Sequence, residues 1–118
     1  MCIRDRLSNV CVARALFGGD TLLGEEVVAD NLVYIAHDVQ IGHRVQICAL
    51  VNILGRTIVG DGAYLGPSAV IKNGLKIGCG AKISIGAVVT QDVPDNAVVS
   101  GNFAIPHDRF LHHIRSIR

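Results

Sequence analysis

The sequence predicts an all-β fold in which short parallel strands wind as one continuous coil around a triangular prism. Three observations predict it. An apolar residue recurs at every sixth position, a small residue usually follows it, and half of the chain is hydrophobic although aromatic residues make up only 4%. The apolar mass is therefore aliphatic, which favours strands. A helix needs a period of about 3.6 residues and an isolated hairpin a period of about two, and a strict period of six matches neither.

The apolar series runs through most of the 118-residue chain without a polar interruption. Each hexad predicts one short strand and one turn, with its first residue pointing into the core and its fifth residue supporting the turn. Three hexads, 18 residues, complete one coil, and consecutive coils pair as parallel strands that leave edges only at the two ends. The first residues of the hexads are Phe17, Leu23, Ala29, Ile35, Ile41, Ile47, Ile53, Val59, Leu65, Ile71, Ile77, Ile83 and Val89.

The chain is expected to divide into three parts. Residues 1–13, which begin MCIRDR and do not follow the period, form a non-repeat leader that we interpret as foreign to a protein truncated at its N-terminus. Residues 14–97 form the β-helix, which ends near Pro94 because proline cannot donate to a strand ladder. Residues 98–118 form an extension with a short amphipathic helix, expected to cap one end of the coil. Its apolar residues at helical spacing are Phe110, Leu111, Ile114 and Ile117.

Composition and charge exclude several classes of function. A formal net charge of +1 does not indicate the basic surface that nucleic-acid binding needs. No apolar run approaches the roughly twenty residues that span a bilayer. The four cysteines lack CxxC spacing and no secretion signal precedes them, which is typical of reduced thiols in the cytoplasm. We therefore expect a cytoplasmic protein with neither a membrane span nor a nucleic-acid partner.

Residues 18 positions apart stack in such a coil, so the sequence predicts columns on its surface. One column consists of Gly19, His37, Gly55, Asn73 and Gln91, and the next of Asp38, Arg56, Gly74 and Asp92. A histidine with glycine on either side projects from the wall beside accessible backbone amides. Asp38 is expected to pair with Arg56 one coil further on.

The column through His37 predicts acyl-transfer chemistry. A neutral imidazole takes up a proton near pH 7, an adjacent carboxylate such as Asp38 holds its tautomer, and the unobstructed N–H of Gly55 is suited to an oxyanion. These three catalytic residues suit transfer from a thioester to a hydroxyl or amine. The column holds no Ser or Cys, so we expect direct attack by the acceptor. Substrate binding is assigned to Asn31, Arg56 and Asn73, and no residue to a metal.

A second outward column is apolar and predicts a subunit interface. A monomer rarely leaves stacked apolar side chains in water over three coils. The column consists of Ala49, Pro67 and Ile85, with Leu50, Val70 and Val88 beside it.

The stretch DNLVYIAHDVQIG, residues 30–42, resembles the active site of the UDP-3-O-acylglucosamine N-acyltransferases, hexapeptide-repeat enzymes of bacterial lipid A biosynthesis, and of the sister UDP-N-acetylglucosamine O-acyltransferases. ALFGGDTLLGEEVVADNLV and SGNFAIPHDRF are more similar to the N-acyltransferase branch, and the resemblance covers residues 14–111. It implies that the β-helix is left-handed, against the usual crossover rule. It also places His37 on the family's general base and Gly55 on the sister enzymes' oxyanion amide.

The same resemblance implies the partners. We expect a homotrimer with sites between neighbouring prisms, no tightly bound cofactor, an acyl-carrier-protein, acyl-CoA or acetyl-CoA donor, and a sugar or UDP-sugar acceptor. The chain departs from the N-acyltransferase pattern at Asp38, where that branch carries Asn, and at Gly74, where it carries a second histidine. Arg56 replaces a histidine of the O-acyltransferases, and the nucleotide-binding domain is missing. A stand-alone relative that acylates another nucleotide or polysaccharide sugar fits nearly as well.

Two alternatives remain open at the level of sequence. One is a non-catalytic trimeric β-helix, a scaffold or an inactive fragment. The other is a zinc enzyme similar to the hexapeptide-repeat carbonic anhydrases, which needs three converging histidines. The repeat holds only His37 and His43, which six-residue spacing places on different faces, so the sequence favours the acyltransferase.

Overall fold

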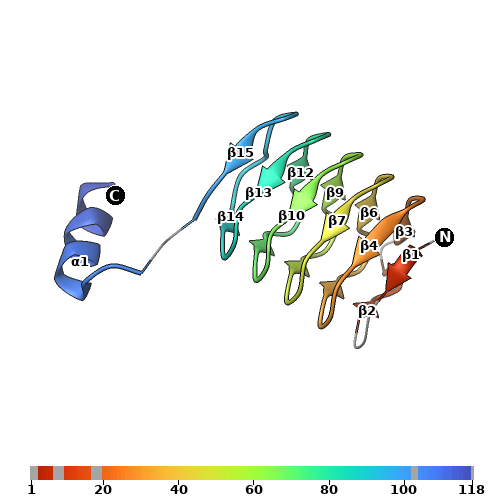
Figure 1. Ribbon diagram of the computed structural model, residues 1–118, viewed down its shortest axis with the longest axis horizontal. Coiled ribbons are helices and arrows are strands. Elements are labelled where there is room, and N and C mark those ends of the chain that lie inside the picture. The colour runs from red at the N-terminus through yellow and green to blue at the C-terminus, as the bar shows by residue number, and fades with distance from the viewer. Residues whose placement is uncertain (1–2, 7–9, 17–19, 102–103, 118) are drawn as a thin grey trace.

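The computed structural model describes residues 3–6, 10–16, 20–101 and 104–117. They form a left-handed parallel β-helix whose coils stack along the longest axis, with one helix at the C-terminal end (Figure 1). The predicted fold class is therefore confirmed. Overall the protein measures 47 × 27 × 26 Å.

Three parallel sheets form the three sides of the prism. The six-stranded sheet contains β1 (Ile3–Arg6), β4 (Val27–Ala29), β7 (Gln46–Ile47), β10 (Tyr64–Leu65), β13 (Lys82–Ile83) and β15 (Val98–Val99). The five-stranded sheet contains β2 (Cys11–Val12), β5 (Tyr34–Ile35), β8 (Asn52–Ile53), β11 (Val70–Ile71) and β14 (Val88–Val89). The four-stranded sheet contains β3 (Leu22–Leu23), β6 (Gln40–Ile41), β9 (Ile58–Val59) and β12 (Lys76–Ile77).

The core is a stack of aliphatic side chains along the axis of the prism. From β3 to β14 the last residue of each strand points inward and is buried, as the hexad series predicts. Ile35 pairs with Ile53, and Ile53 with Ile71, so that like residues lie on one another. All three are fully buried. The period of six arises because each side of the prism buries one such residue per coil.

Two-residue turns join the strands at the corners of the prism. The second turn residue has a positive φ at every sixth position from Glu26 to Gly86, with values between 57° and 74°. This conformation suits a sharp turn. It costs a residue other than glycine about 1 kcal/mol. The hydrogen bonds to the neighbouring coils hold the turns in place, as when Arg56 N–H donates to the carbonyl of His37 at 3.0 Å.

The corners differ in composition. The first corner, between the six- and five-stranded sheets, carries Asn31–Leu32, Ala49–Leu50, Pro67–Ser68 and Ile85–Gly86. The second corner, between the five- and four-stranded sheets, carries His37–Asp38, Gly55–Arg56 and Asn73–Gly74. The third corner, between the four- and six-stranded sheets, carries Glu25–Glu26, His43–Arg44, Asp61–Gly62 and Cys79–Gly80.

The period of 18 fails at both ends of the repeat, and both failures lie at the second corner. Cys11 pairs with Tyr34, 23 residues later, whereas Leu22 pairs with Gln40, 18 residues later. Five extra residues therefore lie between β2 and β3. At the other end Ile77 bridges Val93, only 16 residues later, so the last coil is two residues shorter.

These irregularities correct the predicted series and columns. Val12, not Phe17, pairs with Ile35, because the connection between β2 and β3 contains five more residues than a regular one. Phe17 itself and Gly19 lie outside the described residues. The shortened last coil moves Gln91 and Asp92 out of the predicted register. Asp92 instead accepts the N–H of Lys76 through Oδ1 at 2.9 Å.

The two ends of the chain also differ from expectation. Within the segment expected to be a leader, β1 and β2 pair in parallel with β4 and β5, and so continue the β-helix. Helix α1 (His107–Ser116) forms as expected but does not cap the coil: it stands clear of the last coil in Figure 1, and none of its described residues is buried. Val89 and Val93 of the last coil are only 6% and 4% exposed, so they are buried without a contact from the helix.

Candidate active site

A histidine–carboxylate pair lies at the second corner, as the sequence predicts. Nδ1 of His37 is 3.1 Å from Oδ2 of Asp38. The side chain of His37 is 29% exposed and that of Asp38 only 8%. The imidazole can therefore meet a substrate while its partner carboxylate is largely shielded from water.

The pair fixes the tautomer of the imidazole. An ionised carboxylate only accepts hydrogen bonds, so Nδ1 carries the proton and donates it to Asp38. The lone pair then lies on Nε2. A ring nitrogen with a free lone pair can accept a proton, and in this tautomer that nitrogen is Nε2.

Two residues of the long connection between β2 and β3 hold Asp38. Its Oδ2 also accepts the backbone N–H of Leu16 at 3.0 Å, and its own N–H donates to Oγ1 of Thr21 at 2.9 Å. Its φ of 57° is the left-handed turn conformation. Sequence reasoning missed Leu16 and Thr21, because these contacts span 22 and 17 residues instead of the regular 18.

The ring of His37 lies over Gly55 on the next coil. A Cβ atom at Gly55 would lie 2.5 Å from Nε2 and 3.0 Å from Nδ1 of His37, so only glycine leaves room for the ring. Among the residues that the structure describes, none accepts the N–H of Gly55. At the equivalent turn position of the third corner, His43 N–H points to the next coil and donates to Asp61 at 2.8 Å. We expect the Gly55 N–H to point the same way, toward the coil of Asn73.

The other predicted site residues are partly brought together. Arg56 and Asn73 are exposed at the same corner as His37, on the next two coils. Asn31 is also exposed, but it lies at the first corner, one side of the prism away, and β5 separates it from His37. One chain therefore does not bring Asn31 to the imidazole. The predicted ion pair between Asp38 and Arg56 stays a prediction.

His43 provides a contrast within the same fold. It occupies the equivalent turn position of the third corner, but its Nδ1 accepts the backbone N–H of Glu25 at 2.8 Å. Its proton must therefore lie on Nε2, the opposite tautomer to that of His37. His43 has a structural partner on either side, because its own N–H donates to Asp61.

The predicted apolar surface lies at the first corner and on the adjoining five-stranded sheet. Leu50, Ile85 and Val88 are 50%, 61% and 62% exposed. Leu32 and Tyr34 extend the same surface on the preceding coil and are 54% and 38% exposed. We call these five residues the apolar corner.

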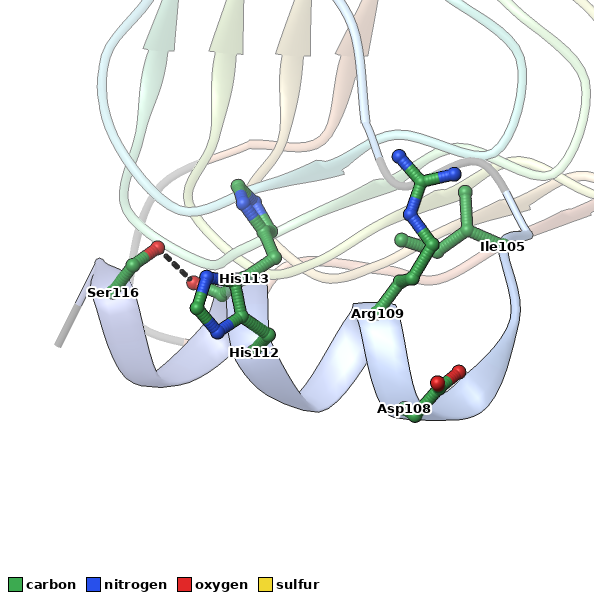
Figure 2. A pocket seen from close by; sticks show the side chains of 6 residues that line it. All are labelled: Ile105, Asp108, Arg109, His112, His113 and Ser116. Atoms are coloured by element: carbon green, nitrogen blue, oxygen red, sulfur yellow. Dashed lines mark hydrogen bonds between the residues drawn. The ribbon is translucent and has the colours of Figure 1, made fainter.

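Two hollows of the surface lie away from His37. One of about 400 Å³ lies on the four-stranded sheet between Leu22, Gln40 and Ile58 and reaches His43. Another, of about 450 Å³, lies beside α1, where Ile105, Arg109 and His113 project on one side of the helix (Figure 2). Neither of these two hollows is lined by His37, whose side chain is 29% exposed at the second corner.

Two further features bear on the class of protein. In the described part of the chain, no three His, Cys, Asp or Glu side chains gather where they could hold a metal ion. Within the same residues, no helix is long and apolar enough to cross a membrane.

Solved structures that share this fold include hexapeptide-repeat acyltransferases. The acetyltransferase domain of PglB from Neisseria gonorrhoeae, in complex with acetyl coenzyme A, is 25% identical over 84% of this chain and 54% of that chain, with a TM-score of 0.57. Soybean serine acetyltransferase is 31% identical over 80% of this chain and 40% of that chain, with a TM-score of 0.51. UDP-N-acetylglucosamine acyltransferase from Campylobacter jejuni covers 98% of this chain and 71% of its own at a TM-score of 0.63, but is 14% identical and shows the fold alone.

The chain spans about half the length of the PglB domain and two fifths of the serine acetyltransferase. No family model matches it, and no curated protein matches it. The similarity of this chain to known proteins is therefore its similarity to these solved structures.

Proposed function

We propose that the protein is an acyltransferase that moves an acyl group from a thioester to an amine or hydroxyl of a sugar, with His37 as general base. One observation carries the proposal: Nδ1 of His37 lies 3.1 Å from Oδ2 of Asp38, which leaves Nε2 beside Gly55 as the nitrogen that can accept a proton. The shared fold with acyltransferases supports the same class of reaction.

The proposed reaction is a direct transfer. Nε2 of His37 accepts a proton from the acceptor amine or hydroxyl as that atom attacks the thioester carbonyl. A bond forms between the acceptor atom and the carbonyl carbon, and the carbonyl electron pair moves to oxygen. The Gly55 N–H then donates a hydrogen bond to this oxyanion. When the carbonyl re-forms, the C–S bond breaks, and the leaving sulfur takes the proton from the imidazolium.

Asp38 stabilises the imidazolium that forms during the attack. A buried carboxylate next to Nδ1 favours the positively charged ring and keeps its orientation. Arg56 and Asn73 are proposed to bind the substrate, since they are exposed at the same corner on the next two coils.

We propose coenzyme A or an acyl carrier protein as the thioester carrier and a nucleotide sugar as the acceptor. The PglB domain is described in complex with acetyl coenzyme A, and the Campylobacter enzyme is named for a UDP-sugar. The similarity of ALFGGDTLLGEEVVADNLV and SGNFAIPHDRF to the UDP-3-O-acylglucosamine N-acyltransferases favours an amine acceptor and a cytoplasmic role in bacterial lipid A biosynthesis.

We further propose that three copies assemble through the apolar corner. Contact through these five side chains would remove an exposed apolar surface from water. It would also bring Asn31, which lies at the first corner, toward a site at a neighbouring copy's second corner. The assembly would thus cover the open side of His37.

The test compares His37→Ala with His43→Ala in the release of thiol from acetyl-CoA, longer acyl-CoA and acyl carrier protein thioesters, with and without a nucleotide-sugar acceptor. We expect acceptor-dependent release by the wild type, a loss of about 100-fold or more in His37→Ala, and near wild-type release in His43→Ala. Equal release by both variants and the wild type would remove His37 from the mechanism. Absence of release from a folded wild-type trimer would favour a scaffold.

A further inference from the structure

The connection between β2 and β3, which is five residues longer than the regular one, contacts the candidate site at two points. Leu16 donates its N–H to Oδ2 of Asp38, and Thr21, just before β3, accepts the N–H of Asp38 through Oγ1. Thr21 is only 9% exposed, and it occupies the hexad position where valine or alanine is usual. A hydroxyl at this buried position therefore has a specific partner, the backbone of Asp38.

We propose that Thr21 is a positioning residue, which holds Asp38 in its left-handed conformation so that Oδ2 faces Nδ1 of His37 and fixes the tautomer of the general base. The inference deepens the proposed function and rests on it for its catalytic consequence. Thr21 does not touch the reacting atoms.

The backbone of Asp38 explains why a holder is needed. A residue other than glycine at a φ of 57° is strained, and Arg56, at the equivalent position one coil later with a φ of 62°, is held by the hydrogen bond from its N–H to the carbonyl of His37. With Asp38 N–H bonded to Thr21, the turn and the direction of the carboxylate are fixed together. Without that bond, the side chain can leave Nδ1 for other rotamers, and the imidazole then loses the partner that determines its proton.

The chain contains a matched control. Thr57 occupies the same hexad position two coils later and is fully buried, but its hydroxyl donates to the carbonyl of Lys72 at 3.0 Å, whereas that of Thr21 accepts the N–H of Asp38. Thr57→Val should therefore remove one buried hydrogen bond, as Thr21→Val does, without touching the His37–Asp38 pair. His43 serves as an internal reference, because its Nδ1 is held by Glu25 N–H.

The experiment measures the tautomers of the histidines by long-range proton–nitrogen NMR correlation in the full chain, in parallel with kcat and KM for acyl transfer. His37→Asn identifies the His37 signals. In the wild type we expect a proton on Nδ1 of His37 and on Nε2 of His43. In Thr21→Val the Nε2–H form of His37 should appear and kcat should fall about tenfold at nearly constant KM, a part of what a general base contributes. Thr21→Ser, which keeps the hydroxyl, should restore both.

The outcomes separate this inference from the proposed function. If the His37 tautomer and kcat of Thr21→Val match those of Thr57→Val, Thr21 is a structural residue only and the inference is overturned. If the tautomer changes as expected but His37→Ala transfers acyl groups at the wild-type rate, Thr21 positions the pair and the proposed function is wrong. A change in the His43 signals of Thr21→Val would show a general distortion of the coil, which also overturns the inference.

Discussion

Replacing Gly55 by alanine should abolish most of the activity and leave the stability nearly unchanged. The new Cβ would lie 2.5 Å from Nε2 of His37, whereas ordinary contacts of a Cβ lie at 3.4–4 Å. The ring must therefore move by about 1 Å. A displacement of this size at a catalytic group costs roughly 100-fold in rate. That loss corresponds to about 2.7 kcal/mol of activation free energy.

The fold should tolerate the same substitution. Gly55 does not have a positive φ, and the atoms that the Cβ meets belong to the end of a flexible side chain, which can turn away. Gly62→Ala is the matched control with the opposite expectation. Its Cβ would have nothing within 4 Å, but its φ of +70° strains an alanine by about 1 kcal/mol. We therefore expect Gly62→Ala to lower Tm by about 4 °C at full activity.

The assay measures thiol release for kcat/KM and thermal unfolding at one protein concentration for Tm. Gly55→Ala should lose activity at an unchanged Tm, and Gly62→Ala should lose Tm at unchanged activity. Wild-type activity in Gly55→Ala would refute the placement of the imidazole over Gly55. A large fall in its Tm would mean that the backbone, and not the ring, accommodates the methyl group.

Three further predictions concern the core, the surface and a titrating pair. Leu65→Ala, at a fully buried position, should cost about 2–5 kcal/mol in the free energy of unfolding measured by urea denaturation. Ile85→Lys should weaken self-association by about 2 kcal/mol or more in analytical ultracentrifugation, whereas Val98→Lys, equally exposed on β15, should not. The hydrogen bond to the Cys48 thiol and the charge of its thiolate, with burial, raise the pKa of Tyr64 above the usual 10.0. The resulting stability is present below pH 10.0 and is lost as the pH rises through the folded value, and Cys48→Ala should shift the absorbance titration of Tyr64 to lower pH.

The regular part of the fold could be predicted because one physical requirement repeats. Every strand from β3 to β14 ends in a buried aliphatic side chain, so the period of six marks the core directly. The period gave a wrong prediction at Phe17, which precedes Leu23 by six residues. The first coil is five residues longer than a regular coil, and Val12 pairs with Ile35 instead. A spacing in the sequence cannot distinguish a regular hexad from a loop of similar composition.

The candidate site could be predicted only where it follows the period. His37 and Asp38 are adjacent in sequence and Gly55 lies one regular coil later, so the three residues could be placed together. Thr21 and Leu16 contact Asp38 across the insertion, and only the folded chain shows which residue of an irregular loop reaches the carboxylate. The position of α1 likewise depends on contacts that its amphipathic pattern does not specify.

The second corner has practical value for protein engineering. Its connection is five residues longer than usual in one coil and two residues shorter in another, yet the strands on either side remain paired with their neighbours. Length changes at this corner are thus absorbed outside the core. Peptides of different lengths can therefore be grafted at this corner in the shortened last coil, between β14 and Val93, which leaves the contacts of Leu16 and Thr21 with Asp38 and the aliphatic stack unchanged.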